Sequence, residues 1–97
     1  MDENKINELL KTSMEMFHKL AERFNLREKM NDDNKYCEMI YKLSDSYVRN
    51  CINFTYIDFD VEKANDDFYL SRKTMTACEA ATNIAYNDLE KIVKELA

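Results

Sequence analysis

The chain has 97 residues, a net charge of −5 and neither glycine nor proline. Average usage would supply about a dozen of these two residues, which are the ones that most often interrupt helices. Their absence also excludes the glycine-dependent phosphate loops and nucleophile elbows. We therefore expect one all-α domain over residues 1–97, built as an antiparallel bundle of three long helices.

Charge and apolar patterning exclude several kinds of partner. A net charge of −5 disfavours direct nucleic-acid binding, because phosphate neutralisation requires clustered Lys and Arg. The chain has no run of about 18 apolar residues, so we expect no membrane contact, and its start, MDENKINELL, is too polar for a secretory signal. Cys37, Cys51 and Cys78 lack paired metal-ligand spacing. We expect reduced thiols, a cytoplasmic protein, and neither metal nor cofactor.

The first predicted helix covers residues 4–30. Its apolar positions step by three and four, which is typical of one buried helix face; they are Ile6, Leu10, Ser13, Phe17, Leu20 and Phe24. A turn follows at residues 31–34, where Asn and Asp stand in for glycine because they tolerate left-handed backbone and cap helices.

The second predicted helix covers residues 34–56, with a stripe of the same spacing at Tyr36, Ile40, Leu43, Tyr47, Cys51 and Phe54. Residues 55–61 alternate with a period near two, but a single unpaired strand would be unstable. We expect a linker that tucks Ile57 and Phe59 against the end of the bundle, with an uninterrupted helix as the alternative.

The third predicted helix, residues 61–96, carries a sustained 3.5-residue repeat that indicates coiled-coil-like packing. Its positions are Ala64, Phe68, Ser71, Met75, Cys78, Thr82, Ala85, Leu89, Ile92 and Leu96. At 1.5 Å per residue it would be about 54 Å long, against about 35–40 Å for the other two. Either it breaks near residues 65–67, or one end overhangs and a second copy covers it. We expect a homo-oligomer, with a dimer favoured.

Catalytic signals are weak. Glu15 and His18 form a Glu-x-x-His pair, but a ferritin-like site needs two such motifs and two further Glu. Both residues lie beside the apolar stripe, so we interpret the pair as a surface coincidence. The missing tight turns also remove the usual oxyanion holes. We predict that the protein is not an enzyme.

Two groups of side chains are candidate binding residues. The first is acidic and includes one aromatic and one basic neighbour: Asp58, Asp60, Glu62, Asp66, Asp67, Tyr69 and Arg72. It would dock a partner protein with a basic surface by electrostatic complementarity, although the acids also suit a helix start. The second, Tyr41, Arg49 and Tyr86, could bind a nucleotide between subunits, because tyrosine and arginine are enriched at binding hot spots.

The sequence therefore favours a non-enzymatic interaction protein that blocks or scaffolds a partner. An antitoxin, a phage-encoded inhibitor and a small regulatory subunit belong to this class. Residue usage typical of AT-rich codons points to a bacterium or phage. The alternative is an oligomer that binds a small ligand or nucleotide between its subunits.

Overall fold

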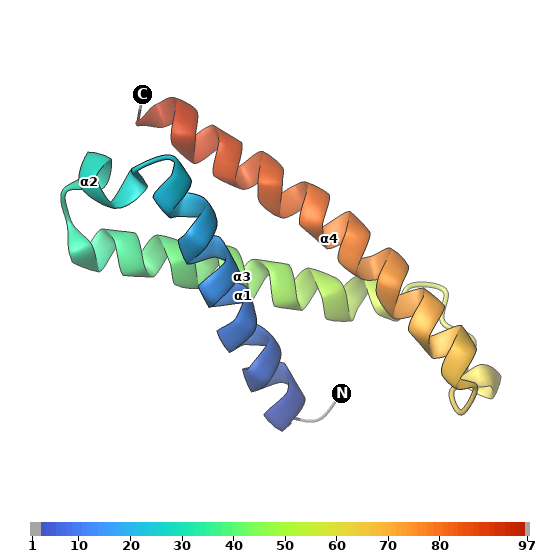
Figure 1. The fold of residues 1–97 in the computed structure, drawn as a ribbon. Helices are drawn as coiled ribbons and strands as arrows, with labels where there is room; N and C mark the ends of the chain where they lie inside the picture. Colours follow the sequence, from blue (N-terminus) through green and yellow to red (C-terminus); the bar gives the residue numbers. More distant parts are fainter. Residues whose placement is uncertain (1–2, 97) are drawn as a thin grey trace.

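A computed structural model describes residues 3–96, and over that range the chain is helical, with no strand. Figure 1 shows three long helices and one short helix. The elements are α1 (Glu3–Arg23), α2 (Leu26–Met30), α3 (Asp33–Thr55), the 3₁₀ turn η1 (Val61–Lys63) and α4 (Asp67–Glu95). The all-α class is confirmed.

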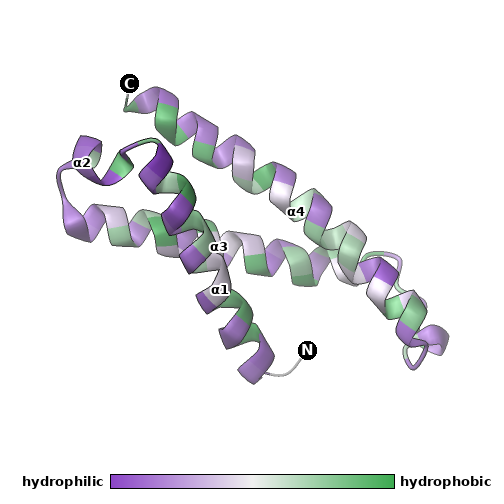
Figure 2. Ribbon diagram, in the orientation of Figure 1, coloured by the Kyte–Doolittle hydropathy of each residue, from purple (hydrophilic) through white to green (hydrophobic). Residues whose placement is uncertain are grey.

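Helix α3 is the element on which the others assemble: α1 and α2 pack at its N-terminal half, and α4 packs against α3 while diverging from it toward the N-terminal end of α3. The main core lies where the C-terminal ends of α1 and α4 meet this half of α3. It contains Phe17, Leu26, Ile40 and Leu89. Figure 2 shows apolar residues interspersed with polar ones along each long helix, as expected for helices that bury one face. An even antiparallel bundle of three long helices is not confirmed.

The first predicted helix is wrong at its C-terminal end, because the chain breaks at Asn25. Asn25 has a φ of 55°, in the left-handed region that Asn tolerates. The break separates α1 from α2 and leaves Phe24 43% exposed, although its spacing predicted burial. Asn31, with a φ of 51°, ends α2 in the same way and confirms the predicted turn.

Helix α3 begins within one residue of its prediction because Asp32 caps it. The Asp32 carboxylate accepts a hydrogen bond from the backbone N–H of Lys35. Arg27 of α2 donates to Asp33 at 3.1 Å, which ties the short helix to the start of α3. This hydrogen bond and the charge of Arg27 lower the pKa of Asp33.

The connection between α3 and α4 is neither strand nor continuous helix. Phe59 packs between Tyr56 and Tyr69, at ring-centroid distances of 5.1 and 5.4 Å. The Tyr69 hydroxyl accepts a hydrogen bond from the backbone N–H of Asp60. Phe59 is therefore tucked in as predicted, whereas Ile57 is 54% exposed and the prediction for it was wrong.

Helix α4 starts at Asp67 rather than at residue 61, so the predicted break near residues 65–67 is present. Its buried positions step by four: Ala77, Ala81, Ala85 and Leu89. Steps of four form the ridges used where helices cross at larger angles than in a coiled coil. The 3.5-residue stripe, through which the sequence predicts self-association, is therefore not buried within the chain in the first half of α4, where Phe68 and Met75 are 72% and 63% exposed.

The molecule is elongated, with extents of 50 × 25 × 16 Å and a radius of gyration of 15.4 Å. A compact chain of this length would have a radius of about 12.5 Å. Its accessible surface is 7111 Å², whereas a compact monomer of this mass would expose about 5,800 Å². The excess of about 1,300 Å² exceeds the roughly 800 Å² that each partner buries in a standard interface.

Candidate functional site

The outer end of the α3–α4 pair concentrates exposed apolar side chains. We call residues 56–75 the distal tip; Figure 1 shows it at the far end of α4 from the C-terminus. Five of the large exposed apolar side chains lie there: Tyr56, Ile57, Val61, Phe68 and Met75. Val61 is the most exposed of them, at 80%. Apolar groups gathered in one region, rather than scattered singly, mark an interaction surface.

Three of the predicted partner-binding residues build the tip. Asp60 caps η1 through the backbone N–H of Glu62 at 3.0 Å. Asp66 caps α4 by accepting from the backbone N–H groups of Phe68 and Tyr69. Tyr69 holds the connection through its hydrogen bond with Asp60. These residues therefore shape the surface locally.

The other three acidic side chains of the distal tip do not take part in the hydrogen bonds of Asp60, Asp66 and Tyr69. Asp58, Glu62 and Asp67 are exposed, and within residues 3–96 none of them forms an ion pair. Asp58 also occupies the left-handed region, with a φ of 52°, and turns the chain after α3. These carboxylates remain available to a basic partner.

A hollow of about 490 Å³ lies on one side of the tip and is more basic than the sequence suggested. The guanidinium of Arg72 lies 5.8 Å from the ring centre of Phe68, and the ammonium of Lys63 lies 5.4 Å from that of Tyr69. Lys73 also lines the hollow and donates to the carbonyl of Ile57 at 2.6 Å. The tip thus combines projecting acids, exposed apolar groups and one basic hollow.

The predicted ligand-binding trio is not brought together within one chain. Tyr41 and Arg49 lie on α3, and Arg49 is paired with Asp45 at 2.9 Å. Tyr86 lies on α4 beside a separate hollow lined by Leu20 and Phe24. Over residues 3–96, no hydrogen bond, ion pair or ring contact joins the three predicted residues.

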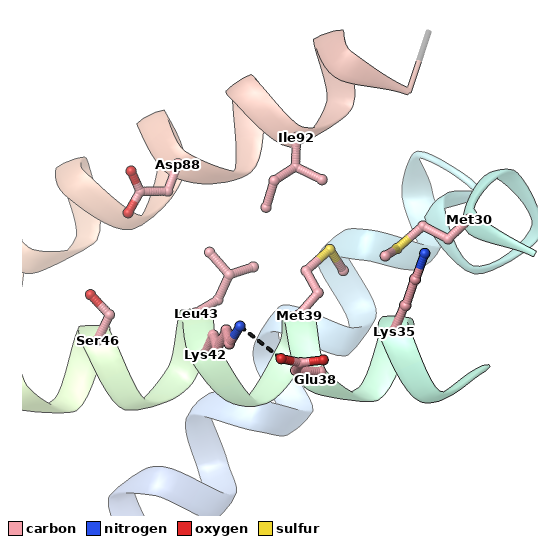
Figure 3. Close-up of a pocket in the computed structure, with 9 residues that line it drawn as sticks. All are labelled: Met30, Lys35, Glu38, Met39, Lys42, Leu43, Ser46, Asp88 and Ile92. Carbon is pink, nitrogen blue, oxygen red and sulfur yellow. Dashed lines mark ion pairs between the residues drawn. The ribbon is translucent and has the colours of Figure 1, made fainter. Parts of the chain in front are cut away.

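A groove between α3 and α4 was missed by the sequence analysis. It has a volume of about 500 Å³ and lies near the C-terminal end of α4. Figure 3 shows Met39 and Leu43 of α3 pointing toward Ile92 of α4, with Lys35 and Asp88 at the edge. Leu43 and Ile92, which line the groove, are apolar stripe positions of the second and third predicted helices. The divergence of the helices, which opens the groove, is a tertiary feature.

His18 belongs to a polar cluster that the sequence spacing did not reveal. Its Nε2 lies 2.9 Å from Oε1 of Glu22, and its Nδ1 lies 2.7 Å from the hydroxyl of Tyr36. Glu15 lines the adjacent hollow but is not its ion-pair partner. Across the described residues, no group of three or more His, Cys, Asp or Glu side chains is arranged to hold a metal ion.

Comparison of the chain with protein-family models, curated proteins and solved structures returned no match. Among the described helices, none is both long and apolar enough to cross a lipid bilayer.

Proposed function

We propose that this protein is a non-enzymatic interaction module that binds a partner protein through the distal tip. Binding would block or scaffold the partner, as expected of an antitoxin, a phage inhibitor or a small regulatory subunit. The observation that carries the proposal is the excess accessible surface together with the five exposed apolar side chains at the tip. Burial of such groups is the main favourable term in most protein associations.

The charges at the tip support a partner with a basic surface. Asp58 and Glu62 adjoin exposed Ile57 and Val61 in the sequence, and neither they nor Asp67 form an ion pair within residues 3–96. Rim charges of this kind steer encounter and suppress wrong partners more than they add affinity. Affinity would come from the apolar groups and orientation from the carboxylates.

The test is capture of partners from an extract of the source cells, with the tagged protein and two tip variants. We expect the double variant Ile57→Ser/Val61→Ser to lose the captured partner, and Asp58→Lys/Glu62→Lys to weaken capture in a salt-dependent way. Tyr41→Ser is the control, because Tyr41 is also an exposed apolar side chain but lies on α3 away from the tip. A partner retained equally by all variants would contradict the proposal.

The second candidate is small-ligand binding, favoured by the apolar groove between α3 and α4 (Figure 3). A bound ligand stabilises the native state, so it would raise the melting temperature by an amount that grows with the logarithm of the ligand concentration relative to its Kd. A nucleotide panel that shifts the melting temperature in wild type but not in Met39→Ser would favour binding in the groove. Loss of the shift in Arg49→Ala or Tyr86→Ala, two residues that do not line the groove, would favour an inter-subunit site.

A further inference from the structure

One face of α4 retains an apolar stripe that the monomer does not bury. Phe68, Ser71, Met75, Cys78 and Thr82 follow the alternating steps of three and four that define the a and d positions of a heptad. Phe68, Ser71 and Met75 are exposed, and Cys78 and Thr82 are half-buried. The helix buries its alanine row, and half-buried Cys78 and Thr82 also reach Cys51 and Tyr47 of α3, so the stripe is fully uncovered only at Phe68, Ser71 and Met75.

Toward the C-terminus, the same side of α4 faces side chains from the end of α1, whereas its first half has no such neighbour. Near the C-terminus, Leu20 and Phe24 of the α1 end lie beside Leu89 and Val93 of α4. Figure 1 shows α1 and α4 separating from that end, so α1 does not cover the first half of α4. The uncovered stripe therefore lies beyond the part of α4 that shares a hollow with the end of α1.

The stripe carries both a projecting group and a hollow. Phe68 projects near the start of the helix, and a hollow of about 500 Å³ lies beside Met75, Cys78 and Thr82. About 16 Å separates Phe68 from the middle of the hollow along the helix. In a two-fold arrangement each copy would place its Phe68 against the half-buried Thr82 of the other, and the two contacts would be equivalent.

The charges beside the stripe select the orientation. Arg72 and Glu79 are one heptad apart and occupy the same flank, and neither forms an ion pair within residues 3–96. If two α4 helices run antiparallel about a two-fold axis near Met75, each Arg72 lies across from Glu79 of the second copy. The dimer would then contain two equivalent ion pairs, each between Arg72 of one copy and Glu79 of the other.

We propose that the first half of α4 is the docking surface for a second copy of this chain, paired antiparallel with Arg72 opposite Glu79 of that copy. The excess surface of about 1,300 Å² is sufficient for each protomer of a standard interface. The proposed dimer would use Phe68 and Met75 of the distal tip and leave exposed Tyr56, Ile57 and Val61 for the partner protein. Purified protein alone tests the dimer, so its failure is distinguishable from failure of the partner proposal.

The first experiment is sedimentation velocity of the purified chain over a range of concentrations. We expect a dimer for wild type and a monomer for Met75→Lys, which places a charge at the two-fold axis. Tyr41→Lys is the control, because Tyr41 is also exposed but lies on α3, and it should remain dimeric. Far-ultraviolet circular dichroism checks that helix content is unchanged. A monomeric wild type would overturn the proposal.

The second experiment is a charge exchange that a merely structural role would not reproduce. Arg72→Glu and Glu79→Arg should each raise the dimer dissociation constant by about tenfold, since two exposed ion pairs become repulsive. The double variant Arg72→Glu/Glu79→Arg should restore the wild-type value. The antiparallel pairing would be excluded if the double variant did not restore the wild-type dissociation constant. It would also be excluded if Arg72→Glu/Asp67→Arg restored that constant instead.

Discussion

At the scale of single residues, burial changes the acidity of two side chains between α3 and α4. Burial raises the pKa of the Tyr47 hydroxyl to about 12. The pKa of the Cys51 thiol is also raised to about 12, mainly by burial and to a lesser extent by a hydrogen bond with Cys78. Their ordinary values are 10.0 and 9.0. Neither group ionises near neutral pH, so both behave there as packing residues, and Cys51 is a poor nucleophile.

These shifts predict a loss of stability at alkaline pH. The folded chain keeps both protons at pH values where the unfolded chain releases them, so the full contribution is present below pH 9.0 and decreases as pH rises toward about 12. We expect the melting temperature of wild type to fall over this range. Tyr47→Phe should flatten the decrease between pH 10 and about 12. Identical slopes for the two proteins would contradict the assignment to Tyr47.

At the scale of elements, helix limits follow from short polar side chains. Asp32, Asp60 and Asp66 each accept backbone N–H hydrogen bonds at a helix start, and Asn25 and Asn31 adopt left-handed backbone at a helix limit. For this reason, the helix limits at the Asn/Asp clusters of residues 31–34 and 58–67 could be predicted from the sequence. The break at Asn25 was not, because a single Asn within an apolar repeat carries no distinctive signal.

The cap of α4 makes the prediction at this scale. Replacement of Asp66 by alanine removes the acceptor for two backbone N–H groups and should lower the free energy of unfolding by about 1 kcal/mol. For a domain of this size, this corresponds to a melting temperature about 4–8 °C lower. Asp66→Asn is the matched control, because asparagine caps about as well. Equal losses for the two variants would show that charge, not capping, is responsible.

At the scale of the whole molecule, the core is small and lies at one end. Phe17 is 1% exposed, forms an edge-on ring contact with Tyr47 and connects α1 to α3. The far half of the α3–α4 pair rests on alanine, cysteine and threonine, which bury little area per residue. Stability should therefore depend on the few large side chains around Phe17.

Phe17→Ala tests this dependence. We expect a loss of about 3–5 kcal/mol, because the truncation leaves a cavity among buried neighbours. Total stability for 97 residues is on the order of 5–15 kcal/mol, so this is a large fraction of it. Met16→Ala, next in sequence but 38% exposed, should cost about 1 kcal/mol or less. The measurement is urea unfolding; similar midpoints for the two variants would contradict the core assignment.

The sequence by itself determined the all-α class and most helix limits, because the absence of glycine and proline and the positions of Asn and Asp are local properties. Which apolar stripe is buried was decided only by the tertiary structure. The same α4 residues satisfy a 3.5-residue repeat and a four-residue alanine row, and the close approach of α3 selects the alanine row. That selection leaves Phe68 and Met75 exposed, and these two side chains belong to the surfaces on which both proposals rest.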